Sequence, residues 1–183
     1  SRYIFEISST REALAVYGYY TSFGSGIEAL FGAVVIAKLI PVLLGQDSDS
    51  TPVKSKIVDS VKKYLLIALA FWTASFIVLY FVLPYINAFT QKEAMQDFIL
   101  LFPIIFAGQM FFSFGAVIQY GLYALNRDRE LAFLAAQYFV LSVILLTVLI
   151  PLYGSVGAAS AMCLASLFIF LGRVRQLFNN WSI

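Results

Sequence analysis

The chain has 183 residues, of which 61% are hydrophobic and 12% charged, with a net charge of +2 and no histidine. Soluble domains carry about a quarter charged residues, so this chain cannot cover a water-facing surface with polar groups. The lack of histidine excludes a histidine general base and a Ser-His-Asp triad. The single cysteine, Cys163, excludes an internal disulfide and a CxxC metal site. We therefore expect a membrane protein that is not an enzyme, holds no cofactor or metal and, given its small net charge, binds no nucleic acid.

Five apolar stretches approach the roughly 20 residues that a membrane-spanning helix requires. They predict an all-α fold, a polytopic transmembrane bundle that forms a single membrane domain over 1–183. The predicted spans are 13–44, 64–83, 98–125, 131–150 and 156–177. Polar links are expected at 45–63, 87–97, 126–130 and at the turn PLYGS, 151–155. The last span reaches its full length only if Arg173 and Arg175 extend their charged groups to the membrane surface.

Prolines indicate where these helices bend or end. Pro41 has no N–H to bond the carbonyl of Ala37, which favours a kink and makes the long, glycine-rich first span irregular. Pro84 and Pro151 are expected to close their spans.

Small residues four apart allow membrane helices to approach closely. The first span has two such series and the last span has one, so we expect both helices to be buried in the bundle. The series are Gly18, Ser22 and Gly26; Ser25, Ala29, Ala33 and Ala37; and Gly157, Ala161 and Ala165.

Basic residues accumulate in short cytoplasmic loops, and here they divide unequally between the two sides of the predicted bundle. One side carries Lys54, Lys56, Lys62, Lys63, Arg127, Arg129, Arg173 and Arg175, and the other carries Arg2, Arg11 and Lys92. This distribution predicts a multi-pass protein of the cytoplasmic membrane, with the N-terminal end of the chain outside and the C-terminus in the cytoplasm.

Two charged residues lie inside the first predicted span. Glu28 and Lys38 each cost about 3 kcal/mol to insert at a helix centre, which makes them candidates for function. On one straight helix, residues ten apart do not share a face, so each needs water or a partner on another helix. Lys38 is also close enough to the end of the span for its amine to reach the membrane surface.

Further polar groups could line a cavity with these two residues. Gln109 and Gln119 lie in the third span, where amides either bond a neighbouring helix or face a substrate. Arg127 and Arg129 lie in the short link after it, where they, like Lys38, could attract a phosphate group.

Four stretches in order resemble a known family. They are SRYIFEISSTREALAVYGYYTSF at Ser1 to Phe23, AKLIPVLL at Ala37 to Leu44, YGLYALNRDREL at Tyr120 to Leu131 and LIPLYGSVGAASAM at Leu149 to Met162. The chain resembles the C-terminal half of the oligosaccharide flippases of the polysaccharide biosynthesis family. That family belongs to the superfamily that also holds the multidrug and toxin extrusion antiporters and the lipid II flippases. Val16 stands where this family usually has glycine.

The resemblance implies a transporter with two six-helix lobes, of which this chain supplies the last five helices of the second lobe. Its partners would be membrane lipids, the missing N-terminal lobe, and a lipid-linked oligosaccharide moved to the outer leaflet by alternating access. A start at Ser1, with no charged segment before the first apolar run, agrees with a longer protein without a signal peptide here.

Two other functions remain open at this stage. In an antiporter of the same superfamily, Glu28 would carry H⁺ or Na⁺ and the cargo would be a drug or an ion. In a non-transporting membrane scaffold, the five helices alone would form no alternating cavity.

Overall fold

The computed structural model describes residues 11–45, 51–89 and 101–178, and within these ranges the chain is helical with no strand. The elements are α2 (Arg11–Phe31), the π-helical turn η1 (Gly32–Ile36), α3 (Ala37–Leu44), α4 (Thr51–Phe89), α5 (Leu101–Ala124) and α6 (Asp128–Phe178). Four continuous stretches are long and apolar enough to cross a membrane: Ala15–Leu43, Lys54–Phe89, Leu101–Ala124 and Asp128–Phe178. The all-α, membrane-spanning fold class is confirmed.

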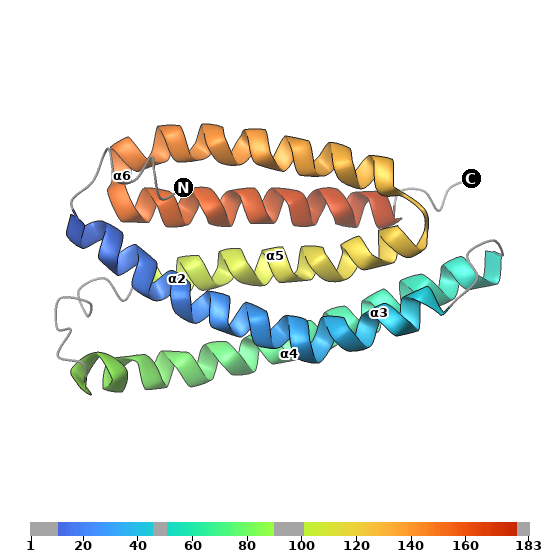
Figure 1. Ribbon diagram of the computed structural model, residues 1–183, viewed down its shortest axis with the longest axis horizontal. Helices are drawn as coiled ribbons and strands as arrows, with labels where there is room; N and C mark the ends of the chain where they lie inside the picture. The colour runs from blue at the N-terminus through green and yellow to red at the C-terminus, as the bar shows by residue number, and fades with distance from the viewer. Residues whose placement is uncertain (1–10, 46–50, 90–100, 179–183) are drawn as a thin grey trace.

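The 51 residues of α6 form two arms rather than one rod. At Gly154 the backbone takes φ 55° and ψ −127°, and the chain reverses direction, so that the two arms run side by side (Figure 1). We call 128–153 the first arm and 155–178 the second arm. With this reversal, which falls within the predicted turn at 151–155, the four helical stretches supply about five spans.

Gly154 should therefore be sensitive to any side chain. Its φ of 55° with ψ of −127° is a conformation that residues with a Cβ rarely adopt, although no atom would meet the added Cβ. We expect Gly154→Ala to lower the free energy of unfolding by about 1–3 kcal/mol, measured by thermal unfolding in detergent. As a matched control, Gly18→Ala adds a methyl group into open space within α2 and should leave stability equal or slightly higher. Equal stability losses in the two variants would contradict this role of Gly154.

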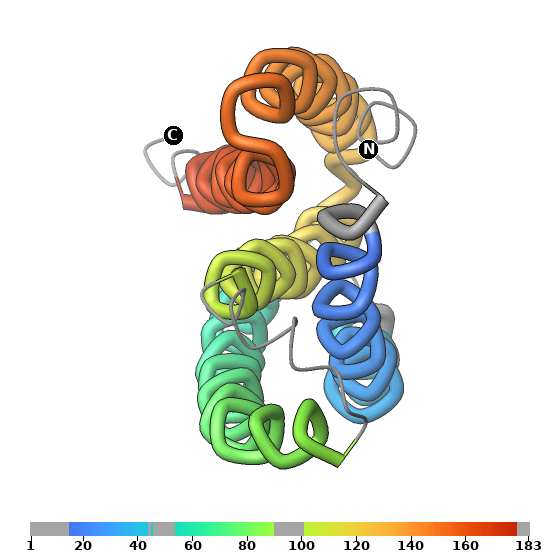
Figure 2. Tube along the Cα trace, turned by 90° about the vertical axis from the view of Figure 1, so that its left-hand side faces the viewer, coloured from blue at the N-terminus to red at the C-terminus, as the bar shows by residue number. Residues whose placement is uncertain are grey.

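Helix α5 lies in the middle of the bundle, with the two arms of α6 on one side and α2, α3 and α4 on the other (Figure 2). Aromatic rings fill the space between α2, α4 and α5 around the fully buried Trp72. The Trp72 ring lies edge-on to Phe106, with 4.8 Å between ring centroids, and Phe76 stacks on Phe102 at 5.8 Å. Such pairs supply the close packing that holds helices together where lipid offers no hydrophobic drive.

The first span is irregular, as the sequence predicts, but the irregularity is a wide turn. In η1 the N–H of Ala37 bonds the carbonyl of Gly32, five residues back instead of four. The turn precedes Pro41, which lies inside α3. Single π-helical turns of this kind occur within α-helices and often near functional sites.

Two expectations about α4 are wrong. The helix starts at Thr51, so most of the predicted link 45–63 is helical, and it continues through Pro84 to Phe89. Its first turns are amphipathic: Ile57, Val58 and Val61 are buried while the lysines beside them are exposed, which gives the helix a face to pack. Thirty-nine residues span about 58 Å, well beyond the roughly 30 Å of a hydrocarbon core.

Pro84 does not end the helix because its exposed position lets the ring and the freed carbonyl point away from the packed interior. Pro151 likewise lies inside α6, and the chain turns only at Gly154. The predicted closure of both spans at proline is therefore incorrect.

The expectation that both small-residue helices are buried holds for one of them. In the second arm of α6, Gly157, Ala161 and Ala165 are buried. In the first span most of the small residues are exposed, because the larger side chains on the opposite face pack into the bundle. The exposed residues are Ser22, Ser25, Gly26, Ala29, Ala33 and Ala37.

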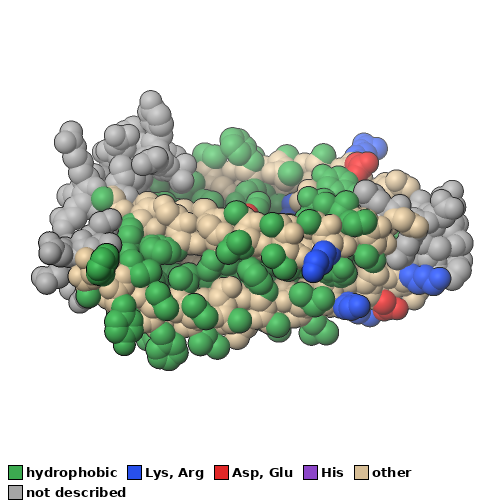
Figure 3. Space-filling view, turned by 60° about the horizontal axis from the view of Figure 1, so that its bottom comes forward, with side chains coloured by type: hydrophobic (Ala, Val, Ile, Leu, Met, Phe, Trp, Pro, Cys, Tyr) green, Lys and Arg blue, Asp and Glu red, His purple; other side chains and the backbone are tan. Residues whose placement is uncertain are grey.

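Charged side chains concentrate towards one end of the bundle. Figure 1 shows the start of α4, the link between α5 and α6 and the end of α6 together at this end, which we call the basic end. Figure 3 shows hydrophobic side chains spread over most of the visible face, with Lys and Arg gathered towards that end. The described lysines and arginines that the sequence places on one side are on these segments.

Candidate functional site

A cavity of about 200 Å³ lies between α2, α5 and both arms of α6. Such a volume holds several water molecules but is smaller than most drug-binding pockets. Six of its eleven lining residues have polar side chains, although apolar atoms form most of the lining surface. It is lined by Tyr17, Thr21 and Glu28 of α2, Ile105, Gly108, Gln109 and Phe112 of α5, and Tyr138, Ala159, Met162 and Ser166 of α6.

The spacing of residues on α2 explains why its polar groups share the cavity. Tyr17, Thr21 and Glu28 are four and seven residues apart, which places them along one face of a helix. Thr21 Oγ1 donates a hydrogen bond of 2.7 Å to the carbonyl of Tyr17, which satisfies the hydroxyl within the helix.

Glycines bring the cavity walls close together. A Cβ on Gly108 would lie 3.1 Å from Cα of Cys163, so α5 and the second arm of α6 are in near backbone contact there. On the other side, the Gln109 side chain lies directly against Gly24 of α2, where any Cβ would collide with the amide. Gly24 and Gly108 thus set the width of the site and position the amide of Gln109 within it.

Glu28 and Gln109 are the two sequence candidates that the structure brings into one cavity. Gln109 Nε2 donates a long hydrogen bond of 3.5 Å to Ser25 Oγ of α2. Glu28 is half-buried, and within the described part of the chain no hydrogen bond or ion pair satisfies its carboxylate. A carboxylate in this position can accept hydrogen bonds from water, a cargo hydroxyl or a bound cation.

Lys38 and Gln119 lie outside this cavity. Lys38 is exposed on α3, and its backbone carbonyl accepts a 3.3 Å hydrogen bond from the Tyr64 hydroxyl of α4. Gln119 lies further along α5, where its Nε2 donates a 3.1 Å hydrogen bond to the Tyr123 hydroxyl.

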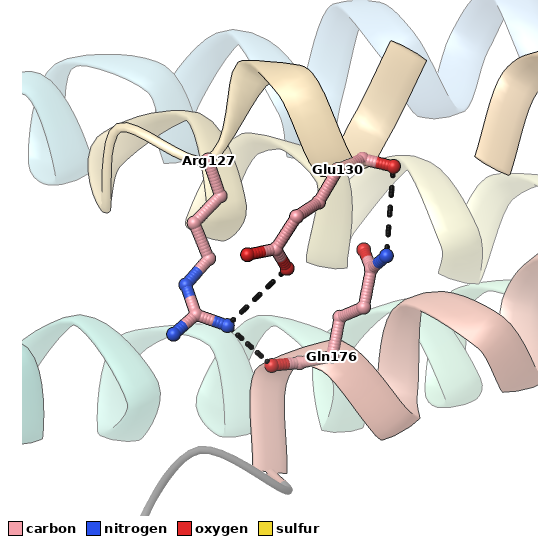
Figure 4. A network of polar contacts seen from close by, with 3 residues as sticks. All are labelled: Arg127, Glu130 and Gln176. Carbon is pink, nitrogen blue, oxygen red and sulfur yellow. Dashed lines mark hydrogen bonds and ion pairs between the residues drawn. The ribbon is translucent and has the colours of Figure 1, made fainter. Parts of the chain in front are cut away.

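Arg127 and Arg129 lie at the basic end, where Arg129 is exposed. Figure 4 shows Arg127 reaching across to the end of α6, where its Nη1 donates a 2.9 Å hydrogen bond to the carbonyl of Gln176. The same nitrogen lies 3.5 Å from Glu130 Oε2. Gln176 Nε2 donates back to the carbonyl of Glu130 at 3.5 Å. Arg127 therefore fastens the two arms of α6 together at their basic ends.

Arg173 corrects a further expectation. The sequence suggests that its side chain reaches the membrane surface, yet it is 6% exposed, and a Cβ on Gly115 of α5 would lie 3.0 Å from its Nη1. Arg175, two residues along, is exposed as expected. Arg173 turns inwards because Gly115 leaves room for the guanidinium beside α5.

Several other polar residues, Tyr17 and Thr21 of the cavity among them, escape the sequence analysis. Tyr138 and Ser166 line the cavity, but tyrosine and serine are common enough in membrane helices to give no signal. Asn87, fully buried in α4, accepts a 2.8 Å hydrogen bond from the Tyr19 hydroxyl of α2. In the sequence, Asn87 falls in a predicted polar link after Pro84, where an asparagine gives no sign of being buried.

Comparison with known proteins finds no matching family model, no matching curated protein and no matching solved structure. Within the described ranges, no group of three or more Cys, Asp or Glu side chains could hold a metal ion. The fold and the cavity together define the class: a polytopic helical membrane protein with a polar interior site between its helices.

Proposed function

We propose that the protein is a membrane transporter, a flippase that moves polyprenyl-diphosphate-linked oligosaccharide units across the cytoplasmic membrane for surface polysaccharide synthesis. The observation that carries this proposal is the cavity between α2, α5 and α6, which presents a carboxylate, an amide and hydroxyls inside a membrane-spanning bundle. Polar groups are expensive at this depth and commonly mark a pathway for cargo. The order of sequence features that resembles the flippases supplies the substrate class.

The chemistry of the lining suits a sugar. Carboxylate and amide groups exchange hydrogen bonds with sugar hydroxyls, and the rings of Tyr17, Phe112 and Tyr138 offer apolar surface for pyranose faces. The volume of about 200 Å³ would admit part of an oligosaccharide, so the full unit requires the site to widen during transport.

In this proposal the exposed face of α2 and α3 would contact the other lobe. That face carries the small residues of the first span and Lys38, which lie on the surface and not in the cavity. Small residues permit close helix contact, so the two lobes would rock against each other there. The basic end would face the cytoplasm, where Arg127 and Arg129 would meet the diphosphate.

One observation favours a second candidate function. Glu28 lines the cavity without a partner in the described part of the chain, as a cation-binding carboxylate would. In an antiporter of the same superfamily this carboxylate would bind H⁺ or Na⁺ while the cavity carried a drug.

The proposed function is tested by expressing variants of the full-length protein in cells that lack the native one and measuring export of polysaccharide. We expect Gln109→Leu in the full-length protein to lower surface polysaccharide about tenfold or more, because an amide that orients cargo is lost at the centre of the site. Glycosylated polyprenyl diphosphate should accumulate in the inner leaflet. Surface polysaccharide is measured with an antibody, and membrane insertion by protease accessibility.

Gln137→Leu is the matched control. This glutamine is exposed on the first arm of α6, outside the cavity, and its replacement should leave export unchanged. Wild-type export by the Gln109 variant, with both variants inserted normally, would refute transport of this cargo through the cavity.

A further inference from the structure

Arg173 is the most costly buried group in the described part of the chain. It lies between α5 and the second arm of α6 with 6% of its surface exposed. Its Nε has no hydrogen-bond partner, and no carboxylate pairs with the guanidinium within the described residues. A buried arginine without a counter-charge is strongly destabilising, and a guanidinium cannot escape the cost by losing its proton. An anion that arrives from outside the chain would remove this cost.

Two tyrosines add possible hydrogen-bond donors to the surroundings of Arg173. Tyr123 on α5 and Tyr138 on the first arm of α6 both contribute to the electrostatics at the guanidinium. The Tyr123 oxygen already accepts the hydrogen bond from Gln119, so its own proton is directed elsewhere. Two hydroxyl protons and a planar guanidinium form a donor set that matches the several oxygens of a phosphate group.

The position along the membrane points to a lipid phosphate. Arg173 is three residues, about 4.5 Å, inside the contact between Arg127 and Gln176 at the basic end. It is seven residues, about 10 Å, from Ser166 of the cavity. With the basic end at the membrane surface, as the predicted topology places it, Arg173 would lie near the depth of lipid phosphates, just outside the hydrocarbon core. Tyr123 is 42% exposed and borders an apolar hollow with Ile40, Leu43 and Tyr120, which offers apolar surface to a lipid tail beside this tyrosine.

We propose that Arg173, Tyr123 and Tyr138 form a binding site for the phosphate group of an anionic lipid at the basic end of the bundle. Because Tyr138 also lines the cavity, the site would hold the phosphate of a lipid whose headgroup extends into the cavity. The identification of that lipid as polyprenyl diphosphate rests on the proposed flippase function. The phosphate site itself stands on the buried guanidinium and its donors.

Binding to the purified full-length protein tests this site. Native mass spectrometry in a neutral detergent would compare polyprenyl diphosphate with polyprenol, and phosphatidylglycerol with phosphatidylcholine. We expect the wild type to bind the phosphate-bearing polyprenyl lipid and not the alcohol, and Arg173→Gln to lose at least about tenfold in affinity. Arg175→Gln, which removes the exposed arginine of the same helix turn, should bind as the wild type does.

Two further variants keep the test decisive. Arg173→Lys retains the charge but not the fork of donors and should bind several-fold more weakly than the wild type. Tyr123→Phe changes an exposed side chain, should fold normally, and should also lose several-fold in affinity even if Arg173→Gln fails to fold. Without anionic lipid, Arg173→Gln should be at least as stable as the wild type, because the uncompensated buried charge is gone. If Arg173 served only to pack the helices, the variant would be less stable than the wild type both with and without lipid.

The outcomes separate this site from the proposed function. Preference for polyprenyl diphosphate over phosphatidylglycerol supports both. Equal or tighter binding of phosphatidylglycerol, lost in Arg173→Gln, supports the phosphate site and contradicts the flippase substrate. Wild-type affinity in both Arg173→Gln and Tyr123→Phe, or no binding of either anionic lipid, would overturn the site while the proposal based on the cavity stands.

Discussion

Gly157→Leu is expected to prevent the two arms of α6 from closing on each other. A Cβ at Gly157 would collide with the backbone carbonyl of Leu149 and lie 3.2 Å from the backbone nitrogen of Ile150. Backbone atoms cannot rotate away as side chains can, so the arms must separate. We expect a loss of about 3 kcal/mol or more in the free energy of unfolding, with most of the protein aggregated. Size-exclusion chromatography and thermal unfolding in detergent measure this effect.

Ala135→Leu is the control for that variant. Ala135 is an exposed small residue on the first arm of α6, outside the face of α2 and α3 that would contact the other lobe. Its leucine would point away from the described bundle, so the variant should remain monodisperse. If the Gly157 variant were equally monodisperse and stable, the two arms of α6 would not pack through this contact.

Glu28 should distinguish the two transport mechanisms. If the carboxylate accepts hydrogen bonds from sugar hydroxyls, Glu28→Leu should lower polysaccharide export roughly 10- to 100-fold, the loss of one charge-assisted bond. Glu28→Gln keeps an acceptor oxygen and should stay within a few-fold of the wild type. The measurement is surface polysaccharide at matched expression, as for the Gln109 variant.

If the cavity binds an ion instead of a sugar, both Glu28 substitutions should abolish transport. Glutamine cannot bind and release a proton, and it neutralises a sodium site, so an ion-coupled antiporter would lose transport as completely with glutamine as with leucine. Equal, severe defects in both Glu28 variants, together with loss of drug efflux, would replace the flippase proposal with the antiporter.

The sequence predicts the helices of this protein better than their faces. The apolar run 64–83 lies within α4, and the turn PLYGS contains the reversal at Gly154, because length, hydropathy and glycine are local signals. The start of α4 at Thr51 is missed because hydropathy does not register an amphipathic helix that leaves the membrane.

In a membrane helix, the neighbouring residues in the sequence do not indicate which face packs against protein and which faces lipid. Lipid is as apolar as a helix partner, so the small residues of the first span carry no sign of whether they are buried or exposed. The same uncertainty applies to Arg173 and Arg175, which look alike in sequence and point in different directions in the fold. Glu28 and Gln109 could be selected by their insertion cost, but their meeting in one cavity depends on the glycines that bring α2, α5 and α6 together.

The wide turn η1 has a consequence for how this helix could evolve. The bond from Ala37 to Gly32 encloses one residue more than an α-helical turn does, so the extra residue is absorbed within a single turn. Elsewhere in the span, losing or gaining one residue would rotate everything beyond it by about 100° and turn Glu28 away from the cavity or Leu39 out of the core. At Gly32–Ile36 a deletion of one residue would instead restore a regular helix and keep the faces on both sides aligned. The half of this span that lines the cavity and the half that packs near the basic end can therefore change in length at η1 without rotating each other out of place.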